Sequence, residues 1–196
     1  MNYFDMHLSQ VAPLAWQVFL GHLDTAVIEI SGFTPEGDLI PSSSVGNNKT
    51  WLDQADKIIL EVNRWQSEAL DGMHDIYYGT DLPPNRVPIP LVKPDDRIGQ
   101  AHFKVDPSKI VAIVETDTPD RNAPFAEPDD TAEAIAGHLL DFLKHEVKVG
   151  RLPASMLPLQ SGVGNVTNAV LSGLLDSPFE NMTAFTEVIQ DGMLDL

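Results

Sequence analysis

The sequence contains no cysteine and is poor in basic residues. Without cysteine the chain can form no disulfide, no thiolate metal site and no cysteine nucleophile, which fits a reducing compartment. Its 12 Lys and Arg residues face 29 Asp and Glu residues, so the formal net charge is −17. A charge of this size repels nucleic acid and anionic membranes, and neither is expected as a partner.

Long apolar runs are also missing. No stretch approaches the roughly 18 apolar residues that a membrane span needs, and the N-terminus lacks the basic region and apolar core of a signal peptide. We expect a cytoplasmic location, or a mitochondrial one in a eukaryote. The 196 residues, 43% of them hydrophobic, fit a globular chain with one large domain or two small ones.

The first two thirds of the chain carry the pattern of an α/β protein. Apolar residues at 57–62 and 110–114 form runs that predict strands buried on both faces, as in a parallel sheet. Residues 63–99 have little regular pattern and include five prolines, and residues 116–128 are typical of a linker. The remaining expected elements are a short helix within 2–20, a strand at 26–30, a turn at 34–38, extended structure at 39–40 and a helix at about 49–55.

A strong helix is predicted after the linker. Asp130 and Glu133 have the spacing of a capping box, and Gly150 and Pro153 mark the end of the helix. Its expected buried stripe consists of Ile135, Leu139, Phe142, Leu143 and Val147.

Residues 157–165, with the sequence LPLQSGVGN, predict a short buried strand that runs into a glycine turn. Asn165 is expected to cap a following helix, and the chain then returns as a second strand at about 182–188. Such a βαβ unit brings both strands out in parallel, so Val163 and Glu187 would lie at the same sheet edge. Helix N-terminal N–H groups would then face a carboxylate that could act as a nucleophile.

Each of these features has a plainer interpretation. A Gly-x-Gly is usually just a tight turn, and a glutamate at a strand end is more often a surface residue. His138 and His145 are better explained as solvated helix residues than as a zinc pair. His74 beside Asp75 could serve acid–base chemistry, but packing at an interface is the simpler explanation.

The motifs at 157–165 and 186–193 resemble the acetyl-CoA hydrolase/transferase family of class I CoA-transferases, with particular likeness to its succinyl-CoA:acetate CoA-transferases. Further stretches with this resemblance lie at 41–47, 61–63, 72–76, 120–125 and 134–137. The resemblance implies an α/β fold of the NagB/RpiA type, with open sheets and helices on both faces, in two incomplete domains. Residues 1–116 would end the N-terminal CoA-transferase domain, 117–130 would form a linker, and 131–196 would begin the catalytic domain.

The resemblance also implies a mechanism. In that family the glutamate matching Glu187 is the covalent nucleophile, which passes through a mixed anhydride to a glutamyl-CoA thioester. The N–H of Val163 would contribute to the oxyanion hole. The coenzyme A site would be lined by Gln160, Ser161, Gly162, Val163, Gly164 and Asn165.

The expected substrates are an acyl-CoA, from acetyl-CoA or succinyl-CoA, and a short-chain carboxylate such as acetate or succinate. No metal is required, and the full-length protein is expected to be a homodimer. An acetyl-CoA hydrolase is the nearest alternative. A second alternative is an inactive CoA-binding fragment, because the family's upstream glycine-rich segment and downstream Gly-Gly-Ser-Gly-Asp-Phe stretch are not in this sequence.

Overall fold

A computed structural model describes residues 3–78, 83–121, 128–189 and 191–196. The chain divides into two compact units: unit 1 comprises Met1–Leu91 and Asp96–Asp120, and unit 2 comprises Val92–Asp95 and Arg121–Leu196. None of the described helices is long and apolar enough to cross a membrane. The elements in chain order are η1 Leu8–Gln10, α1 Val11–Trp16, β1 Thr25–Phe33, β2 Leu39–Pro41, α2 Asn48–Gln54, β3 Lys57–Asn63, η2 Glu68–Leu70, η3 Pro107–Lys109, β4 Ile110–Thr116, α3 Asp130–Lys148, α4 Asn165–Leu175 and η4 Asp191–Met193.

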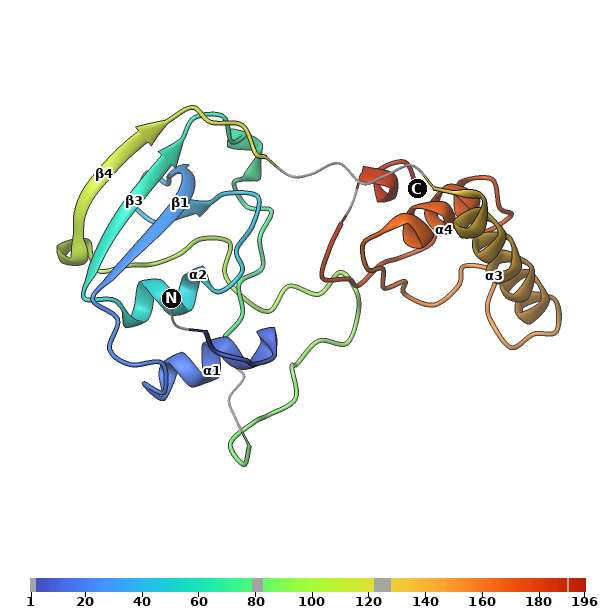
Figure 1. Cartoon of the computed structure of the whole chain (residues 1–196), viewed down its shortest axis with the longest axis horizontal. Helices are drawn as coiled ribbons and strands as arrows, with labels where there is room; N and C mark the ends of the chain where they lie inside the picture. Colours follow the sequence, from blue (N-terminus) through green and yellow to red (C-terminus); the bar gives the residue numbers. More distant parts are fainter. Residues whose placement is uncertain (1–2, 79–82, 122–127, 190) are drawn as a thin grey trace. The chain divides into compact units, whose positions relative to one another are not determined.

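Unit 1 is built on a four-stranded sheet with the order β2-β1-β3-β4 (Figure 1). β1, β3 and β4 are mutually parallel, and β2 pairs with β1 in the antiparallel direction. A tight turn joins β1 to β2, in which Gly37 adopts a positive φ of 90° that a side chain would disfavour. The α/β class predicted from the sequence is therefore confirmed, as are the positions of these strands and of α2.

The core of unit 1 lies between α2 and one face of the sheet. Side chains alternate between faces along a strand, so every second residue of β1 and β3 points to this core. Thr50 and Leu52 of α2 are buried against it. The buried strand residues are Ala26, Ile28, Ile30, Ile58, Leu60 and Val62.

The opposite sheet face and the outer strand are far more exposed than the sequence predicts. Val27 is 65% exposed, and among the described residues of unit 1 no α-helix covers this face. β4 was expected to be buried on both faces, yet Val111, Ile113 and Val114 are 56%, 55% and 48% exposed. The prediction for β4 is wrong because this strand lies at the sheet edge, with β3 as its only strand neighbour among the described residues.

The long irregular segment of unit 1 is closed at its base by backbone contacts. Ile76 and Gln100 form an antiparallel bridge, and the Asp75 carboxylate accepts hydrogen bonds from the N–H groups of Ile98 and Gly99 at distances down to 2.6 Å. A Cβ at Gly99 would lie 2.2 Å from the Ile76 carbonyl oxygen, so only glycine fits there.

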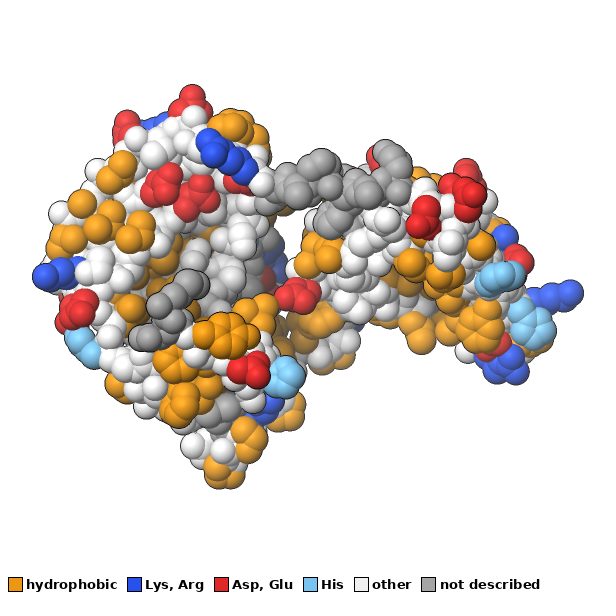
Figure 2. Space-filling model, in the orientation of Figure 1, with side chains coloured by type: hydrophobic (Ala, Val, Ile, Leu, Met, Phe, Trp, Pro, Cys, Tyr) orange, Lys and Arg blue, Asp and Glu red, His pale blue; other side chains and the backbone are white. Residues whose placement is uncertain are grey.

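Unit 2 is organised by the packing of α3 on α4. The contact is close because small residues meet, namely Ala132, Ala136 and Ala169. Farther along the two helices, a Cβ on Gly173 would lie 2.3 Å from a methyl carbon of Leu140. The predicted buried stripe of α3 is confirmed only in part: Leu143 and Val147 pack against the core of unit 2, whereas Ile135, Leu139 and Phe142 are 45%, 39% and 57% exposed. Figure 2 shows hydrophobic side chains on the surface of both units.

The ends of the unit 2 helices also differ from the predictions. Capping by the Asp129–Asp130 pair is expected from the sequence, and Asp129 is the residue that does it, because its carboxylate accepts a 2.8 Å hydrogen bond from the Ala132 N–H; Asp130 is the first residue of the helix. Gly164 is the N-cap of α4, so Asn165 is the first helical residue and does not cap the helix with its side chain.

Candidate functional site

The glycine turn and the segment around Glu187 lie together in unit 2. The two predicted strands, one at the start of 157–165 and one at about 182–188, are reduced to a single parallel bridge between Leu159 and Ala184. Two backbone hydrogen bonds make this bridge, from Leu159 N–H to the Thr183 carbonyl at 2.8 Å and from Phe185 N–H to the Leu159 carbonyl at 2.9 Å. The strand lengths were wrong, but the expected parallel direction is present.

A side-chain clamp follows the bridge. The Thr186 hydroxyl accepts a hydrogen bond from the Ser161 N–H at 3.2 Å and lies 3.0 Å from the Ser161 carbonyl, to which it can donate. Ser161 and Thr186 each stand two residues after a bridge partner, so the clamp continues the register of the bridge. Ser161 is buried, with 9% exposure.

Val163 and Glu187 come directly after this clamp. Because the two segments run in the same direction, the residues that follow Ser161 and Thr186 leave the bridge at the same end. Both Val163 and Glu187 are exposed, and Glu187 forms no ion pair with any residue that the structure describes. The carboxylate is therefore open to solvent and free of a cation that would compete with a substrate.

The glycine turn leads into the N-terminus of α4. Gly164 precedes the 11 residues of α4 with a φ of 125°, a conformation that favours glycine. The first N–H groups of a helix have no partner within it, and their partial positive charge favours an anion. The Gln160 amide donates to the Ser161 carbonyl at 3.0 Å, which ties this side chain to the turn.

Sequence reasoning did not assign Thr186 a role. The strand register could have indicated one. If Leu159 is paired with Ala184, the next pair of residues on the same side of the two segments is Ser161 and Thr186.

Unit 1 gathers a polar cluster at the carboxyl ends of its parallel strands. The buried Asn63 amide donates to the Glu29 carboxylate at 2.7 Å and to the Thr118 carbonyl at 2.8 Å, while its oxygen accepts from the N–H groups of Trp65 and Thr118. All four hydrogen-bonding positions of the amide are used. Asn63 therefore links the strand ends and has no hydrogen-bonding position left for a ligand.

Neighbouring loops join this end of unit 1. Asp120 accepts hydrogen bonds from Gln66 at 3.1 Å and Ser43 at 3.5 Å. The His74 ring donates to the Ser42 carbonyl at 2.8 Å, and burial lowers the pKa of His74 below its usual value. Burial therefore favours the neutral form of His74, and its ring hydrogen-bonds within unit 1 to the loop at Ser42.

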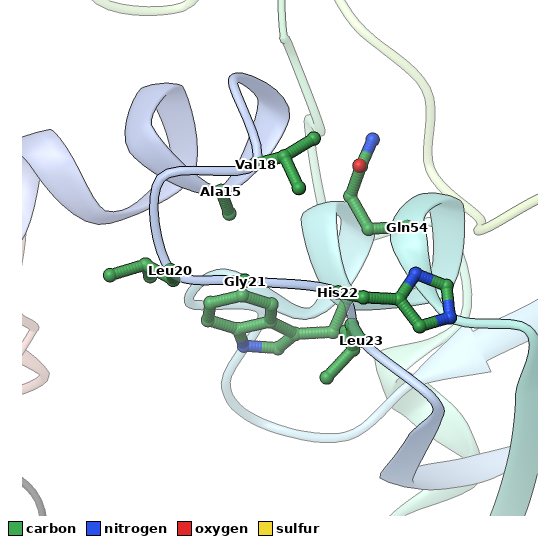
Figure 3. A pocket seen from close by; sticks show the side chains of 8 residues that line it. Ala15, Val18, Leu20, Gly21, His22, Leu23 and Gln54 are labelled. Carbon is green, nitrogen blue, oxygen red and sulfur yellow. The ribbon is translucent and has the colours of Figure 1, made fainter.

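Among the described residues, one group has the composition of a cation site. His22 Nε2 lies 2.8 Å from Asp56 and 3.6 Å from Asp24, and all three side chains are well exposed. The adjacent pocket, bordered by Val18, His22 and Gln54, is shown in Figure 3 and holds about 90 Å³. Pockets for small organic ligands hold about 300–1,000 Å³, so this one is too small for a coenzyme.

Comparison with known protein families identifies the family of the chain. The sequence model of the acetyl-CoA hydrolase/transferase N-terminal domain matches residues 1–115. The chain belongs to the acetyl-CoA hydrolase/transferase family. It is 46% identical over 196 residues to a succinyl-CoA:acetate CoA-transferase of Clostridium kluyveri, covering all of this chain and 36% of that protein. It is 45% identical over 202 residues to an acetyl-CoA hydrolase of Neurospora crassa, covering all of this chain and 38% of that protein.

Solved structures support the fold of this family member. RipA from Yersinia pestis aligns with a TM-score of 0.66 at 21% identity, covering 100% of this chain and 35% of that one. A 4-hydroxybutyrate CoA-transferase from Porphyromonas gingivalis aligns with a TM-score of 0.58 at 21% identity, covering 98% of this chain and 38% of the other. The chain thus spans a little over one third of the length of the proteins that it matches.

The stretches that carry the family resemblance are distributed over both units. Those at 41–47 and 72–76 meet through the hydrogen bond from His74 to the Ser42 carbonyl, and the one at 61–63 ends β3, where Asn63 holds Glu29 and Thr118. Those at 157–165 and 186–193 meet at the bridge in unit 2. In unit 2 the exposed Glu187 and the start of α4 therefore both follow the same bridge.

Proposed function

We propose that this chain carries the nucleophile of an acyl-CoA:carboxylate CoA-transferase, which uses acetyl-CoA or succinyl-CoA with acetate or succinate. The single observation that carries the proposal is the parallel bridge and Thr186 clamp, which bring the glycine turn and Glu187 out of the same end of one structure. Residues 1–116 would belong to the N-terminal domain of the family, 117–130 to a linker and 131–196 to the start of the catalytic domain.

The chemistry begins at the carboxylate. One Glu187 carboxylate oxygen attacks the thioester carbonyl, the carbon–sulfur bond breaks, CoA thiolate leaves, and a mixed anhydride of Glu187 and the acyl group remains. The thiolate then attacks the glutamyl carbonyl, which releases the first acid as a carboxylate and forms a glutamyl-CoA thioester. A second carboxylate reverses these steps and leaves as the new acyl-CoA, so the overall exchange consumes no water and needs no metal.

The glycine turn would stabilise the charge that develops in these steps. Each tetrahedral intermediate bears an oxyanion, and the Val163 N–H would donate to it. Loss of one such donor typically costs roughly 3–4 kcal/mol of barrier. Gln160, Ser161, Gly162, Gly164 and Asn165 would line the coenzyme A site.

An acetyl-CoA hydrolase is the second candidate, because relatives named acetyl-CoA hydrolase match the chain over its whole length. In that case water, rather than a carboxylate, would take the acyl group. The remaining proposals are a cytoplasmic location, or a mitochondrial one in a eukaryote, and a homodimeric full-length protein.

The proposal is tested by trapping the intermediate. The purified chain is incubated with acetyl-CoA and then with borohydride, which reduces a glutamyl thioester to the alcohol, and peptide mass mapping locates the change. We expect modification at Glu187 and none in Glu187→Gln. An unmodified chain at saturating acetyl-CoA would contradict the proposal for this polypeptide and favour a non-catalytic fragment.

Acetate dependence separates the two enzymatic candidates. A transferase moves isotopic label from acetate into acetyl-CoA and loses little acetyl-CoA to water. A hydrolase releases CoA at a rate that added acetate does not change.

A further inference from the structure

The amino ends of β1 and β3 bring three side chains with metal-binding groups together. The first residues of these parallel strands, Thr25 and Lys57, are paired. Asp24 and Asp56 stand directly before them. The Lys57 N–H donates to the Asp24 carbonyl at 2.9 Å. The Asp56 N–H donates to the Leu23 carbonyl at 3.2 Å. The sheet therefore fixes the backbone that carries both carboxylates.

His22 adds a nitrogen donor to the two carboxylates. It stands two residues before Asp24, on the segment that leads from the small pocket into β1 (Figure 3). Its Nε2 lies 2.8 Å from an Asp56 oxygen and 3.6 Å from an Asp24 oxygen. The three donor atoms all lie within 4.8 Å of one another. One ring nitrogen carries at most one proton, so it can donate to only one of the two carboxylates at a time.

The charge at this point is unbalanced. Among the described residues, no Lys or Arg forms an ion pair with Asp24 or Asp56. Two neighbouring carboxylates repel each other, and the chain as a whole has a charge of −17. A cation bound by both carboxylates would remove that repulsion, and the imidazole influences which cation is preferred.

We propose that His22, Asp24 and Asp56 bind a zinc ion, which links the start of β1 to the start of β3. Zinc binds nitrogen and carboxylate oxygen at about 2.0–2.2 Å, and a tetrahedron of that size sets its donor atoms about 3.4 Å apart. The observed separations of 2.8 and 3.6 Å lie on either side of this value. Small rotations of exposed side chains therefore complete the site, and water takes the fourth position. A nitrogen ligand favours zinc over magnesium and calcium, which prefer oxygen.

The proposed zinc site is separate from the acyl-transfer chemistry. It lies at the amino ends of the strands, whereas the polar cluster around Asn63 lies at their carboxyl ends. Glu187 belongs to the other unit. Zinc would act here as a structural link between two chain segments, and it would stabilise unit 1 because it binds the folded state. The inference does not depend on the proposed function.

Calorimetric titration of the chelator-treated chain with zinc chloride tests the site. We expect His22→Ala to raise the Kd at least about tenfold, because even the loss of a residue that only supports a metal ligand costs about 10–100-fold. His138→Ala is the matched control, since His138 is exposed on α3 and belongs to no such group among the described residues. It should bind zinc like the wild type, and magnesium chloride should give no binding at the same concentrations. Equal affinities in wild type and His22→Ala would overturn the proposal.

Thermal unfolding separates zinc held by all three residues from zinc on the imidazole alone. Without metal, Asp24→Asn should unfold no earlier than the wild type, because it removes one of two repelling charges. With zinc at about 100 times the wild-type Kd, the Tm of the wild type should rise and that of Asp24→Asn should rise far less. An equal rise in both chains, or none in the wild type, would exclude this site. These outcomes concern unit 1, so they are independent of the trapping experiment at Glu187.

Discussion

The two units secure their key residues in opposite ways. Unit 1 holds its strands with three ladders of backbone hydrogen bonds and a core in which Ile30, Ile58 and Leu60 are fully buried. Unit 2 holds the glycine turn and Glu187 with one bridge and one hydroxyl group. The candidate nucleophile therefore lies outside the regular helices of its unit. The sheet of unit 1 is held by many contacts, whereas the candidate site segments of unit 2 depend on single contacts, and the comparison can be tested residue by residue.

The largest effect is expected in the core of unit 1. Leu60→Ala removes a side chain with no exposed surface and leaves a cavity, which should lower the free energy of unfolding by about 2–5 kcal/mol. Denaturant unfolding measures the loss, and hydrogen exchange assigns it to a unit. Val27→Ala, on the exposed face of β1, is the control and should change stability by less than about 0.5 kcal/mol. Equal losses in both variants would mean that the two faces are equally packed.

The next effect concerns the clamp in unit 2. Thr186→Val keeps the shape of the side chain but leaves the Ser161 N–H without its acceptor, at a cost of about 1–3 kcal/mol. Amide exchange at Ser161 and in the glycine turn should rise about tenfold or more, with no change in the core strands of unit 1. Thr186→Ser retains the hydroxyl and should exchange like the wild type. Unchanged exchange in Thr186→Val would show that the bridge alone positions the turn.

A smaller effect distinguishes neighbouring acids at the start of α3. Asp129→Ala removes the observed cap and should cost about 1 kcal/mol in the stability of unit 2. Asp130→Ala lies in the first turn, where a negative charge interacts with the helix dipole, and should cost only about 0.3–1 kcal/mol. Thermal unfolding of the pair decides which residue is the cap, and a larger loss for Asp130→Ala would reverse the assignment.

The smallest effect is a dependence of unit 2 on pH. Hydrogen bonds from Arg151 hold the pKa of Glu146 below its usual value. A lowered folded-state pKa stabilises the fold above the unfolded-state pKa, and this stability is lost as the pH falls through the folded-state value. We expect Arg151→Met to remove part of the acid sensitivity of unit 2, measured as the slope of its unfolding free energy below pH 5. An identical slope in wild type and variant would exclude this pair as the cause.

Local sequence predicted where most elements lie but not what covers them. The apolar run in β4 correctly indicated a strand, yet nothing within residues 110–116 says that the strand lies at a sheet edge. The same limit applies to α3. Its stripe of large residues suggested a buried face, but close approach to Gly173 of α4 turned the small residues Ala132 and Ala136 toward the contact instead.

The sequence predicted the motifs of the candidate site but not the side-chain contacts that hold them together. The glycine turn, the α4 helix and the parallel return were read from the spacing of residues 157–188, and the structure shows all three. The Thr186 clamp and the position of the N-cap at Gly164 were not predicted. Both depend on the alignment of the chain to within one residue, and a short apolar stretch does not determine that alignment.

The close contact between α3 and α4 has a consequence for motion in unit 2. With Leu140 against Gly173 the two helices interlock, and this close packing opposes sliding of one helix along the other. The segments that carry Val163 and Glu187 lie outside both helices and are joined by the bridge and the Thr186 hydroxyl instead. A change in the position of either segment can therefore occur without repacking of the helix pair.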